Sequence, residues 1–276
     1  MLKGHIEFTS IPGPLTNKPV RFGIYLPAEY ETAGNVPFAV LYFLHGLNED
    51  YRANLANLAQ VLETGVDEGI IRPMLIITPD SYANGMWADS KSGHKPSETH
   101  LIRELIPHID STYRTIARRS HRIIGGFSMG GYGACRCAVK YSELFSTCFS
   151  MDGAMHTLGT MKRIRGPIYA EIFEDDDDYF RDFCLYALAE KYRAEVMAKV
   201  DFFILVGLLK SFNQRFRRLF AEIGIPIPDE RFVLTGCEHN AACILDREGL
   251  NLLAWLEGHM AAADGEIGCN RQGHAI

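Results

Sequence analysis

The chain lacks an apolar run long enough to cross a membrane. Its longest apolar stretches, residues 38–44 and 202–209, fall far short of the roughly 20 residues that a transmembrane helix needs, and they predict buried strands instead. The N-terminus has no apolar core after Lys3. We therefore predict no secretory signal peptide and no membrane partner.

The chain also lacks clusters of basic residues. Its 28 Lys and Arg against 34 Asp and Glu give a formal net charge of −6. Because phosphate contacts require gathered positive charge, we predict no nucleic-acid partner. With 47% hydrophobic and 22% charged residues, the composition excludes a disordered or fibrous chain.

Cysteine is present but follows no regular framework. There are seven cysteines, an odd number, at irregular spacings. This usage is more typical of reduced thiols in the cytoplasm than of disulfides. We therefore predict a cytoplasmic protein with reduced cysteines.

Short strand patterns alternate with helical patterns along most of the chain. Residues 20–26 alternate apolar and polar side chains, which predicts a half-buried antiparallel strand. Apolar strands are predicted at residues 38–44 and 74–77, and further strands at residues 122–127, 144–151, 202–206 and 231–234. Helices are predicted at residues 51–68, 97–113, 130–141, 211–223 and 245–260. This order predicts an α/β fold with a mostly parallel sheet and helices on both faces.

One segment interrupts the alternation of strands and helices. Residues 158–200 contain an acidic run at 174–178 and an aromatic-rich helical pattern at 179–192. An insertion between two strands of an α/β sheet lies above the strand ends, where ligands bind. We predict a single domain over residues 1–276 with a small cap insertion at about 155–200, and a frayed tail after residue 263.

The sequence Gly126-Phe127-Ser128-Met129-Gly130 matches the pattern G-x-S-x-G. An apolar strand precedes Ser128 and a helix rich in small residues follows it, which is the strand–turn–helix context of a nucleophile elbow. Glycines beside the serine relieve the crowding that a strained turn creates. The alternative is a glycine-rich packing site with an incidental serine.

With this elbow the chain resembles the esterase family of α/β-hydrolases, which includes esterase D (S-formylglutathione hydrolase), feruloyl esterases and the mycolyltransferases. The resemblance covers about residues 20–259. Its most specific stretches are Leu44-His45-Gly46-Leu47, residues 104–114 and residues 126–134. The resemblance implies an α/β-hydrolase fold and a Ser-acid-His triad that acts on esters or thioesters.

The resemblance also suggests a base and two oxyanion donors. The family base lies in a turn after the last strand, which here reads Thr235-Gly236-Cys237-Glu238-His239, so His239 is the candidate. A histidine of a surface loop is the alternative. The backbone N–H groups of Met129 and Leu47 are the candidate donors to an oxyanion. His45 fits a role in shaping the loop that carries Leu47 better than it fits the role of base.

The acid is where the chain departs from the family. The family pattern Gly-x-x-Asp after the strand at 203–207 here ends in Lys210, which cannot stabilise an imidazolium. Asp152, at the end of the strand that follows the nucleophile strand, keeps the chain order Ser, acid, His. Two alternatives stay open: Asp152 is an ordinary Asp-Gly turn residue, or the triad lacks an acid.

Two weaker signals concern substrate and metal binding. Trp87 and Asp89 lie in a long loop where family members carry a related Asp-Ser, which favours a substrate-binding role, with a core position as the alternative for Trp87. Cys237, His239 and Cys243 match no structural zinc spacing. We predict no metal and no cofactor.

These residues together predict a cytoplasmic serine hydrolase whose partner is a small-molecule ester or thioester. An acyltransferase or cyclase, in which an alcohol or amine replaces water, is an alternative with the same acyl-serine chemistry. A catalytically impaired binding module is a second alternative, because Lys210 replaces the family acid. The acyl group, the leaving group and any homo-oligomer are left open by the sequence.

Overall fold

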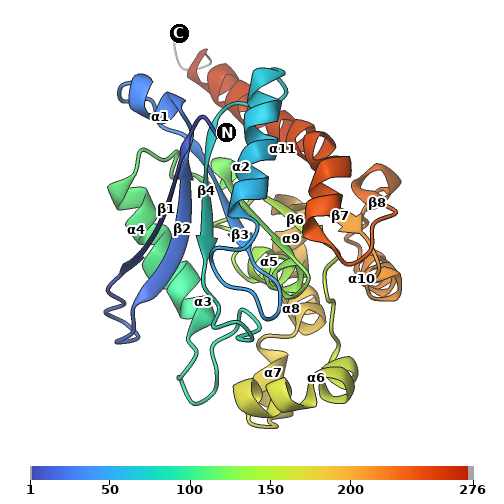
Figure 1. Cartoon of the computed structure of the whole chain (residues 1–276). Helices are drawn as coiled ribbons and strands as arrows, with labels where there is room; N and C mark the ends of the chain where they lie inside the picture. Colours follow the sequence, from blue (N-terminus) through green and yellow to red (C-terminus); the bar gives the residue numbers. More distant parts are fainter. Residues whose placement is uncertain (1, 273–276) are drawn as a thin grey trace.

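A mostly parallel sheet of eight strands forms the centre of the described chain, residues 2–272 of the computed structural model (Figure 1). The strand order across the sheet is β1-β2-β4-β3-β5-β6-β7-β8. The pairs β1–β2 and β2–β4 are antiparallel, and the other neighbours are parallel. The strands are β1 (His5–Ile11), β2 (Val20–Leu26), β3 (Ala39–Leu44), β4 (Met74–Pro79), β5 (Arg122–Phe127), β6 (Thr147–Met151), β7 (Asp201–Val206) and β8 (Phe232–Leu234).

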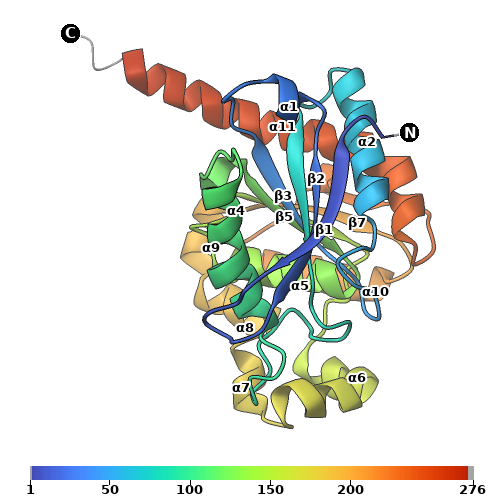
Figure 2. The ribbon, with the colours of Figure 1, turned by 60° about the vertical axis from the view of Figure 1, so that its left-hand side comes forward.

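Helices cover both faces of the sheet (Figure 2). Leu41 and Phe43 of β3 belong to the core beneath α2 (Leu55–Asp67) and α11 (Ala241–Gln272), whereas Tyr42 belongs to the core on the opposite face. That second face packs against α4 (Ile106–Thr112), α5 (Met129–Lys140) and α10 (Lys210–Glu222). Because both faces are buried, the central strands are apolar without alternation. The predicted α/β architecture is confirmed.

Four helices lie between β6 and β7 in the chain. They are α6 (Leu158–Phe173), α7 (Asp177–Arg181), α8 (Leu185–Lys191) and α9 (Arg193–Lys199). Figures 1 and 2 show α6 and α7 beyond the edge where the parallel strands end. The Tyr179 hydroxyl donates to the Asp89 carbonyl at 3.0 Å, and the Lys91 ammonium pairs with Asp176 at 2.8 Å, which ties this segment to the loop after β4.

The remaining short helices lie at the ends of longer elements. They are α1 (Glu29–Thr32), α3 (Ser97–Thr99), a π-helical stretch (His100–Leu105) and two 3-10 turns (Arg119–His121 and Asp229–Arg231). The predicted continuous helix over 97–113 is therefore interrupted by a π-helical segment. The prediction of a frayed tail after residue 263 is wrong for residues 264–272, because α11 continues to Gln272, and the rest of that tail lies outside the described residues.

The prediction of reduced cysteines is wrong for one pair. Cys237 and Cys243 form a disulfide, with their Cα atoms 6.0 Å apart. Cys135, Cys137 and Cys148 are free and buried, as is Cys184. Within residues 2–272, no helix combines the length and the apolar character that a membrane span requires.

Candidate active site

Ser128 occupies a strained turn between β5 and α5. Its backbone has φ 57° and ψ −114°, a combination that residues other than glycine rarely adopt. The Ser128 N–H donates to the Met151 carbonyl at 2.9 Å, and the Ser128 carbonyl accepts from Ala154 N–H at 3.0 Å. Both bonds join the turn to β6 and to the loop that follows it.

Glycines let the backbone pack closely around this turn. A Cβ atom on Gly130 would lie 1.9 Å from the Leu44 carbonyl oxygen, and one on Gly126 would lie 2.4 Å from the Gly130 carbonyl carbon. Both distances are much shorter than a van der Waals contact, so neither position has room for a side chain. The motif glycines therefore place the end of β3 directly against the start of α5.

His239 links the serine to a carboxylate. The Ser128 Oγ lies 2.8 Å from His239 Nε2, and His239 Nδ1 lies 2.6 Å from Asp152 Oδ2. With the ring proton on Nδ1, His239 donates to Asp152 and accepts from the Ser128 hydroxyl. The ring of His239 packs on Phe127, with 4.6 Å between centroids. This is the geometry that a Ser-His-acid relay requires.

Asp152 is fully buried at the end of β6 and has φ 47°. Its Oδ1 accepts hydrogen bonds from the N–H groups of Gly207 and Leu209, each at 2.9 Å. Its own N–H donates to the Leu205 carbonyl at 2.6 Å. A buried carboxylate requires such compensation, since without donors its desolvation is costly.

Lys210 begins α10 and is exposed. The turn that precedes it, Gly207 to Leu209, points two N–H groups at Asp152. A Cβ on Gly207 would lie 3.1 Å from Asp152 Oδ2 and 2.7 Å from the Glu238 carbonyl oxygen, so a larger residue there would crowd the acid. The turn that carries the acid in the family pattern here binds an acid supplied by the neighbouring strand.

Two backbone N–H groups near Ser128 have no acceptor within residues 2–272. Neither Leu47 N–H nor Met129 N–H donates a hydrogen bond to any part of residues 2–272. Met129 is the first residue of α5, where backbone donors lack helical partners. A Cβ on Gly46 would lie 3.4 Å from Ser128 Cβ, which places the loop of Leu47 next to the serine.

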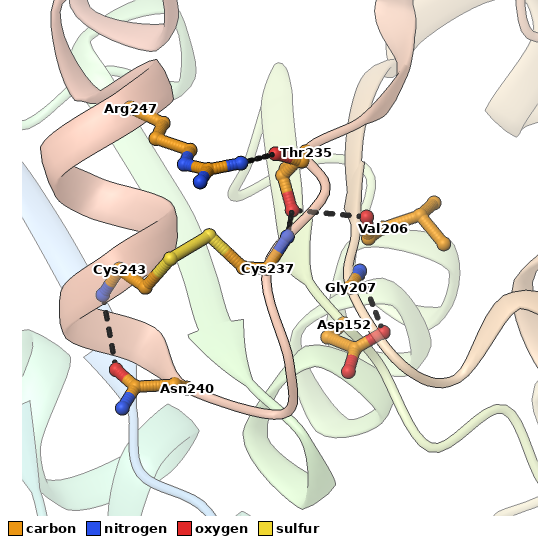
Figure 3. The surroundings of a disulfide bond; sticks show 8 residues. All are labelled: Asp152, Val206, Gly207, Thr235, Cys237, Asn240, Cys243 and Arg247. Atoms are coloured by element: carbon orange, nitrogen blue, oxygen red, sulfur yellow. Dashed lines mark hydrogen bonds between the residues drawn. A yellow bond between two sulfur atoms is a disulfide. The ribbon is translucent and has the colours of Figure 1, made fainter.

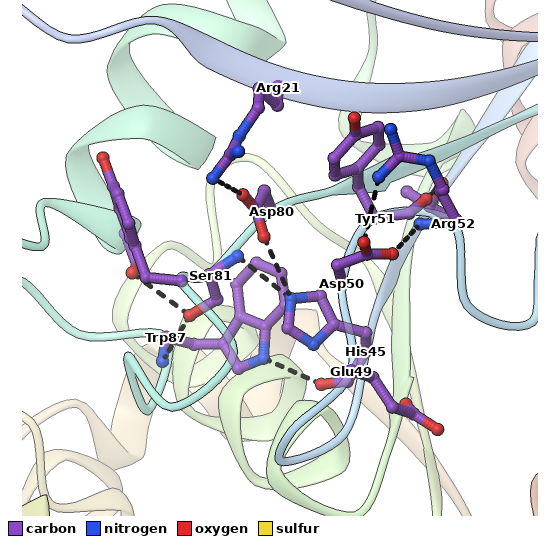
Figure 4. Close-up of polar contacts among 12 residues, drawn as sticks. Arg21, His45, Glu49, Asp50, Tyr51, Arg52, Asp80, Ser81 and Trp87 are labelled. Carbon is purple, nitrogen blue, oxygen red and sulfur yellow. Dashed lines mark hydrogen bonds and ion pairs between the residues drawn. The ribbon is translucent and has the colours of Figure 1, made fainter.

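His45 contacts Ser81, Asp80 and Trp87 (Figure 4), and it also holds the peptide that carries the Leu47 N–H. Its Nδ1 donates to the Gly46 carbonyl at 2.8 Å, while its Nε2 accepts from Ser81 N–H at 3.0 Å. These two bonds fix the neutral ring with its proton on Nδ1. Because the Gly46 carbonyl and the Leu47 N–H belong to one planar peptide, orienting the first orients the second. The Gly46 N–H donates to Glu49 at 2.7 Å, which further fixes this loop.

The Asp80 carboxylate lies between the His45 ring and the Arg21 guanidinium. Burial raises the pKa of Asp80, but the Arg21 guanidinium, 2.7 Å away, outweighs that effect and holds the pKa below the ordinary value. Asp80 therefore stays ionised at neutral pH. Asp80 Oδ1 lies 3.7 Å from His45 Nε2, so a negative charge lies next to this ring.

Trp87 and Asp89 both have partners in the protein. Trp87 is fully buried, and its Nε1 donates to the His45 carbonyl at 3.2 Å. This contact favours the core interpretation for Trp87. Asp89 accepts hydrogen bonds from Thr99 N–H and from the Thr99 hydroxyl. A substrate-binding role for either residue stays a prediction.

A disulfide that we did not predict flanks His239. Cys237 precedes it by two residues in the loop after β8, and Cys243 lies in the first turn of α11 (Figure 3). The paired sulfur atoms are unavailable as metal ligands. The Cys-x5-Cys spacing around the candidate base is the one signal in the sequence that could have suggested the pair.

A family model described as "Putative esterase" matches residues 13–183. The chain belongs to this family. The resemblance stated from the sequence is thereby confirmed, and the matched region contains Ser128 and the loop of Leu47.

Curated relatives match parts of the chain. "Esterase MT1326" of Mycobacterium tuberculosis is 33% identical over 135 residues, which are 47% of this chain and 28% of that protein. An "Endo-1,4-beta-xylanase/feruloyl esterase" of Xylanibacter ruminicola is 28% identical over 167 residues, 55% of this chain and 22% of that protein. The chain thus spans about a quarter of the length of these relatives.

Solved structures of esterases share the fold. A "ferulic acid esterase" superposes with a TM-score of 0.79 at 20% identity over 94% of this chain and 100% of that chain. An S-formylglutathione hydrolase from Agrobacterium tumefaciens gives a TM-score of 0.73 at 20% identity, covering 94% of this chain and 97% of that one. The predicted α/β-hydrolase fold is confirmed.

The close packing around Gly130 predicts that a larger residue there destabilises the fold. Gly130→Ala forces a Cβ into the Leu44 carbonyl, and we expect it to lower the free energy of unfolding by about 3 kcal/mol or more. Gly258→Ala is the matched control, because that exposed helical position has no atom within 4 Å of a new Cβ. It should stabilise the protein by up to about 1 kcal/mol through helix propensity. Urea unfolding measures both, and equal stabilities would contradict the packing argument.

Proposed function

We propose that this protein is a serine hydrolase that cleaves a carboxylic ester or thioester through an acyl-serine intermediate. The observation that carries the proposal is the continuous hydrogen-bonded chain from Ser128 through His239 to Asp152. Membership of an esterase family supports the same chemistry.

Acylation begins when Ser128 Oγ attacks the carbonyl carbon of the substrate. The hydroxyl proton moves to His239 Nε2, which lies on the line of the existing hydrogen bond. The imidazolium that forms is stabilised by the Asp152 carboxylate on Nδ1. The tetrahedral intermediate then expels the alcohol or thiol, which takes the proton from Nε2. Water deacylates the serine by the same sequence of steps.

The developing oxyanion needs donors that are already in place. The N–H groups of Leu47 and Met129 have no acceptor within the described chain, so they can bind the oxyanion without first breaking a bond. His45 acts through Leu47, because it fixes the orientation of the shared peptide. We assign His45 as a positioning residue.

A buried acid beside His239 argues against the impaired binding module. Lys210 raised that alternative, but the carboxylate of Asp152 supports a working triad. Acyl transfer to an alcohol or amine is separated from hydrolysis by product analysis with and without an added nucleophile.

The substrate class and the domain organisation are parts of the same proposal. We assign residues 1–276 to one domain, in which α6 to α9 form a cap at about 155–200 that contributes to the acyl pocket. A small-molecule ester or thioester is the proposed partner.

The Cys237–Cys243 disulfide argues against the cytoplasmic location that the sequence predicts, because disulfides are more typical of an oxidising compartment. Cell fractionation tests it.

Ser128→Ala should abolish turnover of p-nitrophenyl acetate and leave the fold intact, since the hydroxyl contacts His239 rather than the core. The measurement is steady-state hydrolysis by purified protein, with circular dichroism as the control for folding. In the unmodified protein a fluorophosphonate should label Ser128. Retained turnover in a folded Ser128→Ala protein would remove this serine from the mechanism.

Asp152→Asn should lower kcat by about 10³–10⁴-fold, because an amide favours the wrong tautomer of His239. KM should change much less, since the carboxylate matters most when the imidazolium forms. Lys210→Asp is the matched control: with Asp152 already bonded to His239, a carboxylate at the exposed position should change kcat little. Near-normal kcat in a folded Asp152→Asn protein, with a gain in Lys210→Asp, contradicts the assignment of Asp152.

His45→Ala should lower kcat by about 10–10²-fold with a small change in KM, because the Leu47 N–H loses its fixed orientation. His5→Ala, at an exposed position in β1, serves as the control. Melting temperatures of both variants identify any loss caused by unfolding. An unchanged kcat in folded His45→Ala would show that the loop keeps its geometry without this ring.

A further inference from the structure

The Cys237–Cys243 disulfide encloses the residue that we assign as the base. His239 lies between the two cysteines, on a loop that leaves β8 and enters α11. Figure 3 shows the disulfide joining that loop to the first turn of the helix. It is the one disulfide within residues 2–272, and it closes a ring of seven residues around His239.

Both ends of this loop are anchored by hydrogen bonds. Cys237 N–H donates to the Thr235 hydroxyl at 3.2 Å, and that hydroxyl donates to the Val206 carbonyl at 3.1 Å. At the other end, Cys243 N–H donates to the Asn240 side chain at 3.0 Å, as in a helix N-cap. The strand end and the helix start are therefore fixed independently of His239.

The middle of the loop has one backbone hydrogen bond of its own, from Asn240 N–H to the Glu238 carbonyl at 2.8 Å. Within residues 2–272, neither the N–H nor the carbonyl of His239 takes part in a hydrogen bond. Glu238, His239 and Asn240 are all exposed as residues, and the His239 side chain retains 32% exposure. What restrains the ring is its contact with Phe127 and the two triad hydrogen bonds themselves.

We propose that the Cys237–Cys243 disulfide is a positioning element for His239, so that reducing it lowers the rate of acyl transfer from substrate to Ser128. The inference rests on the proposed function, in which His239 is the base. The cross-link limits the displacement of His239, whose own backbone N–H and carbonyl make no hydrogen bond within residues 2–272. A displacement of about 1 Å at a reacting group can cost about 10²-fold in rate.

The reductant is a dithiol. One thiolate attacks the sulfur of Cys243, which is half-buried, and Cys237 leaves as a thiolate and takes a proton. The second thiol of the reductant then displaces Cys243 from the mixed disulfide. Two electrons and two protons pass to the protein, and the reductant becomes a cyclic disulfide.

The test compares oxidised and reduced full-length protein. Purified enzyme is treated with dithiothreitol, and iodoacetamide alkylation with intact-mass measurement counts the thiols released. We expect two more alkylated cysteines than in the untreated protein, because Cys135, Cys137, Cys148 and Cys184 are buried. Hydrolysis of p-nitrophenyl acetate should show kcat lowered by about 10–10²-fold and KM within about threefold.

Two controls separate positioning from folding. Re-oxidation by a small disulfide should restore kcat, and near-ultraviolet circular dichroism should show a folded protein throughout. The variant Cys237→Ser/Cys243→Ser should have the low kcat of the reduced protein and no response to dithiothreitol. If the double variant does not fold, the kcat of reduced wild-type protein still tests the effect of breaking the disulfide.

The outcomes distinguish this inference from the proposed function. Equal kcat in oxidised and reduced protein, or loss of the folded spectrum on reduction, overturns the positioning role and leaves the triad untouched. Turnover that survives Ser128→Ala overturns the proposed function instead. A reversible fall in kcat, with slower fluorophosphonate labelling of Ser128 in the same proportion, supports the positioning role.

Discussion

The site depends on how a carboxylate is buried at the end of β6. Asp152 has no exposure, so its charge must be balanced by donors close by. Two of these donors are the N–H groups of Gly207 and Leu209, and the third is the His239 ring. Three donors on one carboxylate fix its orientation, and through it the orientation of the imidazole. The absence of an acid at position 210 is thereby compatible with a complete relay.

Much of this could be predicted from the sequence because it depends on local patterns. Apolar runs marked the parallel strands, and G-x-S-x-G at the end of one of them marked the elbow. The role of Asp152 could be weighed but not decided, since its neighbours in space, Gly207 and His239, are 55 and 87 residues away in the chain. Only the sheet order, with β6 beside β7, brings them together.

Other features could not be predicted, for equally physical reasons. The pairing of Cys237 with Cys243 requires that the helix begin at Ala241 and turn Cys243 back toward the loop, whereas the predicted helix began at residue 245. The prediction therefore left both cysteines in one loop with no geometry to join them. The π-helical stretch at His100–Leu105 escaped notice because its apolar spacing resembles that of an α-helix over so few residues.

The three residues of the proposed triad have unequal backbone support. The serine and the acid follow central strands, and hydrogen bonds beyond the strand ends continue the sheet ladder, from Ser128 to Met151 and from Asp152 to Leu205. His239 instead follows β8, a three-residue strand at the edge of the sheet. An edge strand has a neighbour on one side alone, so the loop after it has fewer backbone partners to fix it. His239, the proposed base, is therefore the member of the proposed triad for which a covalent restraint has the most to contribute.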